Sequence, residues 1–258
     1  MKKGRGKMGR LIGTSLIVLA LMFVCPLAYA EDSSDTKAWE FSLAPFYVWA
    51  VNMEGDVGMK GVTAPLKMDF GQIFDSLEGL FTAHFEGWWR QKWGFLFDVS
   101  YIDISDSQAT PVVTLDVDFQ SVMTEFVGFY RFAKGPHALE PLAGIRYTSL
   151  ETDVDILGVP FGVKETEDWV DPIIGARYKY NITEKWLVTL RGDIGGFTVG
   201  SDFTWNLGGL IHFQPWKHIG FAGGYRALDV DYESGSGLSK FTYDVLMQGP
   251  ILGVNIIW

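Results

Sequence analysis

The sequence predicts an all-β fold: an antiparallel up-and-down β-barrel that crosses a membrane with about ten strands. Hydrophobic residues make up 48% of the chain and aromatic residues 15%. After the first thirty residues, no apolar run reaches the roughly 18 residues that a membrane-spanning helix needs. The apolar side chains instead lie in many segments of about ten residues with alternating polarity, which is typical of transmembrane barrel strands.

The first thirty residues have the features of a cleaved secretory signal peptide. A basic start precedes an apolar stretch over residues 11–24, and Ala28 and Ala30 supply the small residues that signal peptidase prefers. We therefore expect residues 1–30 to be removed. Residues 31–258 then form a single barrel domain.

The charge and the cysteine count of the processed chain exclude other classes. The only cysteine, Cys25, follows Val24 rather than the small residue of a lipoprotein site, and it leaves with the signal peptide. Removal of residues 1–30 takes five of the 21 basic residues and none of the 31 acidic ones, so the net charge changes from −10 to −15. Such an acidic balance argues against binding to nucleic acid.

Each predicted strand has an apolar face and a polar face. The alternation is clearest in 39–49, 81–90, 139–148 and 203–213. Because successive side chains of a strand point to opposite faces, we expect the aromatic face to meet lipid and the polar face to line the interior.

We predict ten strands, and the alternatives are twelve or eight. Short turns and longer acidic or glycine-rich loops alternate along the chain, which places both ends of the barrel domain on the periplasmic side. The predicted strands are 38–50, 79–90, 93–105, 113–133, 137–151, 166–181, 185–197, 202–213, 217–231 and 240–258.

Two segments leave the strand assignment open. The long loop 51–78 contains a possible hairpin over 57–70 and a possible helical turn over 71–79, and the count becomes twelve if that hairpin joins the barrel. In 113–133 the apolar positions change parity near Gln120, which predicts either a β-bulge or a hidden turn.

The chain end looks like a membrane strand rather than a frayed terminus. Leu252, Val254, Ile256 and the final Trp258 share one face. A terminal aromatic residue on an alternating last strand is similar to the assembly signal of bacterial outer-membrane proteins. We therefore expect the barrel assembly machinery as a partner, together with outer-membrane lipid and lipopolysaccharide.

The predicted interior carries charges of both signs, seven acids against six arginines. Narrow barrels fill their interior with side chains, and buried charges must pair. The sequence therefore favours a salt-bridged plug over a narrow selective pore lined by the same residues. This charge ladder comprises Glu40, Glu86, Arg90, Asp98, Glu125, Arg131, Glu140, Arg146, Asp171, Arg177, Arg191, Asp193 and Arg226.

The sequence offers only a weak catalytic grouping, so an enzyme stays open but is not favoured. His84 and Glu86 share an inward face two residues apart, with Asp98 as a further acid that could orient the ring. There is no Gly-x-Ser-x-Gly motif and no cysteine in the processed chain, and no histidine pair has zinc-site spacing. We expect no catalytic residues, metal or cofactor, and we interpret His84 as a hydrogen-bonded interior histidine.

Several segments resemble a widespread group of uncharacterised bacterial outer-membrane β-barrel proteins, related to porin-like and OmpA-like small barrels. They are WEFSLAPFYVW (39–49), HFEGWWRQKWGFLFDVSYIDIS (84–105), DPIIGARYKYNITEKWLVTLRGDIGGF (171–197), GYRALDVDYE (224–233) and GPILGVNIIW (249–258). The resemblance covers nearly the whole processed chain and implies an outer-membrane location. It implies no catalytic residues.

These observations together predict an integral outer-membrane protein with a structural or narrow-channel role, to which a small solute is a possible partner. One alternative is an enzyme acting on lipid or peptide at the external rim, with His84 and either Glu86 or Asp98. Another is a surface-binding protein that uses the loop 51–78.

Overall fold

A computed structural model describes residues 38–60, 62–109, 114–156 and 162–258. The predicted signal peptide (1–30) and residues 110–113 and 157–161, which include parts of two predicted loops, lie outside the described residues. No helix among the described residues is long and apolar enough to span a bilayer.

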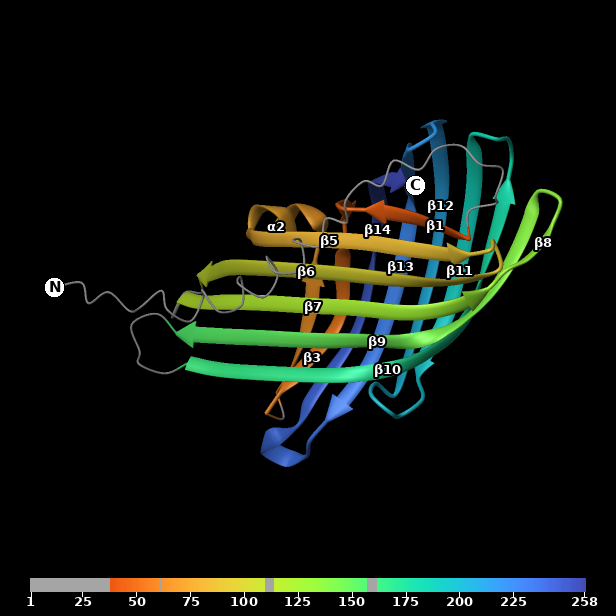
Figure 1. The fold of residues 1–258 in the computed structure, drawn as a ribbon. Coiled ribbons are helices and arrows are strands. Elements are labelled where there is room, and N and C mark those ends of the chain that lie inside the picture. Colours follow the sequence, from red (N-terminus) through yellow and green to blue (C-terminus); the bar gives the residue numbers. More distant parts are fainter. Residues whose placement is uncertain (1–37, 61, 110–113, 157–161) are drawn as a thin grey trace. The chain divides into compact units, whose positions relative to one another are not determined.

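The described residues form a closed antiparallel barrel of ten strands, which confirms the predicted fold class. The long strands from β5 to β14 pair in the order in which they follow one another along the chain, and Figure 1 shows β5, β6, β7, β9 and β10 running side by side. The barrel closes where β1 pairs with β14, through Ser42 with Ile257 and Leu43 with Ile256. The continuous strands are β5 (Leu77–Trp89), β6 (Trp93–Ala109), β7 (Thr114–Tyr130), β9 (His137–Ile156), β10 (Gly162–Asn181), β11 (Trp186–Gly196), β12 (Phe203–Trp216), β13 (Ile219–Ser234) and β14 (Phe241–Ile257).

The tenth strand position of the barrel wall is occupied by three short strands that follow one another. These are β1 (Trp39–Ala44), β2 (Tyr47–Trp49) and β3 (Asn52–Met59), and all three pair with β14. The first break falls at Pro45, which cannot donate a ladder hydrogen bond. The β2 segment is tied to β5 by Thr82, whose hydroxyl accepts from the Tyr47 amide at 2.9 Å.

The predicted hairpin and helical turn in 51–78 both exist. β3 and β4 (Val62–Met68) form the hairpin, and α2 (Phe70–Asp75) follows it. Asp69 caps α2 by accepting from the Gln72 amide at 3.0 Å, and the Gln72 side chain accepts from the Asp69 amide at 3.0 Å. Because β3 continues the strand position that begins with β1, the hairpin adds no further strand to the barrel wall. The alternative counts of twelve and eight strands are therefore wrong.

The predicted irregularity near Gln120 is wrong. β7 keeps one register with β6 and with β9 along its described pairs, without a bulge or a turn. The parity of the apolar residues changes because the polarity of the two faces changes along the barrel. Phe119 packs inside against buried apolar residues, whereas Phe126 lies seven residues further along on the outer face.

The same reversal occurs in β13 and β14 and divides the interior into two zones. Near the longer loops, Leu228 and Val230 point inward and are buried, while Asp231 lies on the exposed outer face. Nearer the short turns the outer face is apolar and exposed, as at Leu252. We name the inner apolar zone the loop-end cluster, made of Val51, Met53, Ile73, Ile104, Met123, Leu150, Trp169, Leu228, Val230, Tyr232, Phe241, Tyr243, Val245 and Met247.

The two remaining short elements are β8 and η1. β8 (Phe132–Lys134) pairs with β9 and extends the wall beyond β7 at the short-turn end. A short 3-10 turn, η1 (Gly237–Ser239), joins β13 to β14 at the opposite end, which we call the loop end.

Close backbone approach in the wall requires glycine at Gly224. A Cβ atom built there would lie 1.9 Å from the Gly209 carbonyl oxygen, whereas one at Gly208 would have its nearest neighbour at 3.6 Å. We expect Gly224→Ala to lower the free energy of unfolding by about 1–3 kcal/mol through overpacking, and Gly208→Ala to change it by less than about 0.5 kcal/mol. Urea unfolding of the refolded barrel measures both; equal effects of the two substitutions would contradict the geometry.

Candidate functional site

A group of three arginines and two acids crosses the middle of the barrel. Arg146 is fully buried and donates to Glu125 at 2.9 Å and to Asp193 at 2.8 Å. Arg191 donates to the same two carboxylates, at 2.8 Å each, and Arg226 donates to Glu125 at 2.9 Å. Because the five side chains come from β7, β9, β11 and β13, they tie opposite walls together. We call this group the central ion cluster.

A second group lies closer to the short turns. Arg131 and Arg177 each donate to a different oxygen of Glu140 at 2.6 Å, and Arg177 also donates to Glu86. The Lys179 ammonium lies farther from its carboxylates, 3.6 Å from Glu86 and 3.9 Å from Glu140. We call these five side chains the turn-side ion cluster. It contains three cations and two carboxylates.

The weak catalytic candidates come together beside the turn-side ion cluster. Nδ1 of His84 lies 2.9 Å from Asp98 and Nε2 lies 3.3 Å from Glu86. The Tyr47 hydroxyl donates to the other oxygen of Asp98 at 2.7 Å. Since carboxylates occupy both ring nitrogens, neither is left to activate a hydroxyl nucleophile. The three residues lie inside the barrel and not at the external rim, where an enzymatic role was expected to place them.

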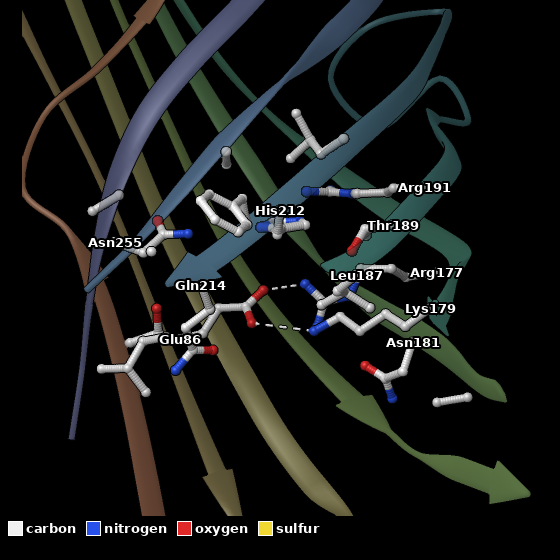
Figure 2. A pocket seen from close by; sticks show the side chains of 18 of the residues that line it. Glu86, Arg177, Lys179, Asn181, Leu187, Thr189, Arg191, His212, Gln214 and Asn255 are labelled. Carbon is white, nitrogen blue, oxygen red and sulfur yellow. Dashed lines mark hydrogen bonds and ion pairs between the residues drawn. The ribbon is translucent and has the colours of Figure 1, made fainter. Parts of the chain in front are cut away.

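A cavity of about 500 Å³ extends from both ion clusters toward the short turns. Its lining includes Glu86 and Arg191 in the interior and Gly135 and Lys185 at the turns. Figure 2 shows the labelled side chains of β10, β11 and β12 projecting into this space together with Glu86. A cavity of this size and chemistry can hold a small molecule.

Four other predicted residues take individual positions. Glu40 lines the cavity and accepts a hydrogen bond from Gln91. Trp258 lies on the outer face, with its ring 6.0 Å from that of Phe41. The other two, Arg90 and Asp171, differ from the prediction.

Arg90 is not part of an interior ladder. It lies exposed in the turn after β5 with a φ of 50°, and its guanidinium sits 4.9 Å from the ring centre of Trp89. The strand parity ends at Trp89, so the alternation could not be extended to the next residue.

Asp171 points inward and is fully buried, but its partners are uncharged. Its carboxylate accepts from the backbone amide of Ser201 at 2.7 Å, from the Ser201 hydroxyl at 2.8 Å and from the Trp169 indole at 3.1 Å. Asp171 therefore holds the β11–β12 connection instead of pairing with an arginine.

Sequence reasoning missed three cavity residues: Tyr47, Lys179 and Thr189. Lys179 has the same parity as Asp171 and Arg177, so the alternation of β10 already places it inside. Tyr47 was assigned to the lipid face because it has the parity of the aromatic residues in 39–49. The break at Pro45 shifts the parity of the following strand, so Tyr47 points inward. Among the described residues, no three or more His, Cys, Asp or Glu side chains are arranged to hold a metal ion.

Comparison with solved structures places the fold among bacterial outer-membrane barrels. The chain is similar to the outer membrane protease OmpT from Escherichia coli, with a TM-score of 0.61 and 6% identity over 88% of this chain and 99% of that one. It is also similar to the translocator domain of the autotransporter NalP from Neisseria meningitidis, with a TM-score of 0.47 and 10% identity over 96% and 95% of the two chains. No family model and no curated protein sequence matches. The likeness to outer-membrane proteins seen in the sequence is therefore supported at the level of the fold.

Proposed function

We propose that this chain is an integral outer-membrane β-barrel with a closed interior, which serves a structural role and does not form an open pore. The observation that carries the proposal is the filling of the barrel at two levels. Arg146 in the central ion cluster and Leu228 and Val245 in the loop-end cluster are all 0% exposed. A continuous water path would leave such side chains partly accessible.

The outer surface supports insertion in a bilayer. Leu207, Ile211 and Leu252 are more than half exposed on outward-facing positions, which in water would form an unusually large apolar patch. Barrels of this class have short periplasmic turns and longer external loops. The cavity would then face the periplasm, and the loop-end cluster would close the external side.

The partners follow from this placement. Outer-membrane lipid would cover the apolar outer face, and lipopolysaccharide would surround its external rim. Trp258 at the end of the closing strand is the residue we propose for recognition by the barrel assembly machinery. Secretion through the inner membrane with residues 1–30 as the signal peptide completes the proposed route.

Planar-bilayer recording tests the closed interior. We expect the purified, refolded protein to produce no steady conductance steps when an open porin, inserted in the same bilayers, conducts normally. Regular steps that scale with the amount of inserted protein would instead assign a narrow channel lined by the two ion clusters.

A further inference from the structure

Several polar side-chain atoms that line the cavity have no hydrogen-bond partner within the described part of the chain. They are Nη2 of Arg177, Nε1 of Trp88, the Thr189 hydroxyl and Nε2 of His212. Arg177, Trp88 and Thr189 are each less than a tenth exposed. Leaving a buried polar atom unsatisfied costs about 1–3 kcal/mol, so four such atoms in one cavity indicate that something else forms hydrogen bonds with them.

Arg177, Thr189 and His212 belong to one wall of the cavity, which is formed by β10, β11 and β12. Lys179 is directly opposite Thr189 in the β10–β11 pairing, and His212 is opposite Leu187 in the β11–β12 pairing. The Lys179 ammonium lies 4.9 Å from the ring centre of Trp88 on β5, which is its cation–π partner. Figure 2 shows Arg177, Lys179, Thr189 and His212 extending into the same space.

The charges of the turn-side ion cluster, which lies against this wall, are not balanced. The turn-side ion cluster has the cations Arg131, Arg177 and Lys179 but only the carboxylates Glu86 and Glu140. Lys179 is the cation left over, because its distances of 3.6 and 3.9 Å to the carboxylates exceed those of a hydrogen bond. Its neighbour His84 does not change the count, since the ring is already held by Asp98 and Glu86.

We propose that this wall binds a small organic anion, whose carboxylate or phosphate group is held by Lys179, Arg177 and Thr189. An anionic oxygen would accept from the free Nη2 of Arg177 and from the Thr189 hydroxyl, and it would neutralise the excess charge at Lys179. The cavity of about 500 Å³ leaves room for an organic body beyond the anionic group. The site does not depend on whether the barrel conducts.

Titration calorimetry of the purified full-length processed barrel in a non-ionic detergent tests this site. The probes are citrate for a carboxylate ligand, glycerol phosphate and inorganic phosphate for a phosphate ligand, and glycerol as a neutral control. We expect saturable one-to-one binding of at least one anionic probe and no binding of glycerol. Binding of citrate alone assigns a carboxylate ligand, and binding of the phosphates alone assigns a phosphate ligand.

Three variants locate the binding. Lys179→Met removes the excess cation and leaves two cations for two carboxylates, so we expect it to fold and to weaken binding about tenfold or more. Thr189→Val keeps the shape but removes the hydroxyl, and we expect it to weaken binding about threefold to tenfold. Lys92→Met, in the exposed turn between β5 and β6, is the matched control and should bind as the unmodified protein does.

Two outcomes would overturn the proposal. One is the absence of saturable binding for every anionic probe. The other is equal binding by Thr189→Val, Lys92→Met and the unmodified protein, which would show that the anion binds elsewhere on the surface. Thr189→Val keeps this test valid even if Lys179→Met fails to fold.

Discussion

Replacing Glu125 by glutamine is expected to lower the free energy of unfolding by about 3–5 kcal/mol, the usual cost of removing one partner of a buried ion pair. Glu125 is 2% exposed and accepts from Arg146, Arg191 and Arg226. Glutamine preserves the shape but not the charge. Arg146 and Arg191 would then keep only Asp193 among the acids that they contact in the described residues, and Arg226 would lose the one carboxylate that it is shown to contact there. Urea unfolding of the refolded barrel in detergent, followed by tryptophan fluorescence, measures the change.

Glu184→Gln provides the matched control for this experiment. Glu184 lies exposed in the turn between β10 and β11, so the same chemical change there should alter the free energy of unfolding by less than about 0.5 kcal/mol. A Glu125 variant as stable as the Glu184 variant would mean that the central ion cluster is hydrated. The proposal of a closed interior would then lose its main support.

The strands could be predicted from sequence because each one repeats a two-residue period over many residues. That signal is local, and it also assigned the inward position of Glu86, Arg146 and Arg177. It failed where a local irregularity resets the period. Pro45 interrupts the first predicted strand, and Tyr47 after it points inward. The turn after Trp89 leaves Arg90 outside the barrel.

The pairing of the interior charges could not be predicted, because it depends on the closure of the barrel. Arg177 and Glu86 are 91 residues apart in sequence, and Arg226 and Glu125 are 101 apart. Which inward positions face each other across the interior is set by the stagger and tilt of the strands, and no single strand contains that information. The unbalanced charge at Lys179 follows from the same geometry.

The polarity reversal at the loop end misled the sequence analysis for a different reason. The sequence interpretation assumed that each face of a strand has the same surroundings along its whole length, with lipid outside and a polar interior inside. In β7 and β13 the outer face changes from apolar to acidic, and the interior changes from charged to apolar. The change of parity near Gln120 was therefore explained by a bulge or a hidden turn, although Phe119 packs inside with the loop-end cluster in a regular strand. A change of parity in a long barrel strand can thus mark the level at which the strand leaves the membrane.

That level can be located by placing the same charge on the outer face at two heights. Leu207 of β12 is 60% exposed and lies between Phe203 and the stacked pair of Phe213 and Trp186, which flank the apolar band. We expect Leu207→Arg to lower the free energy of unfolding in lipid bilayers by about 2–4 kcal/mol, because a charge near the bilayer midplane loses its hydration.

Asp231→Arg is the control at the loop end, and it places arginine on the same outward-facing surface beyond the band. Asp231 is paired with Asp244 across the strands. Partial burial and the nearby Asp244 carboxylate raise the pKa of Asp231, so a positive charge there meets no penalty from its neighbours. We expect a change of less than about 1 kcal/mol, measured by urea unfolding of both variants in the same vesicles. If the two arginines have equal effects, the outer face of Leu207 is not in hydrocarbon, and the assignment of the apolar band to the membrane is wrong.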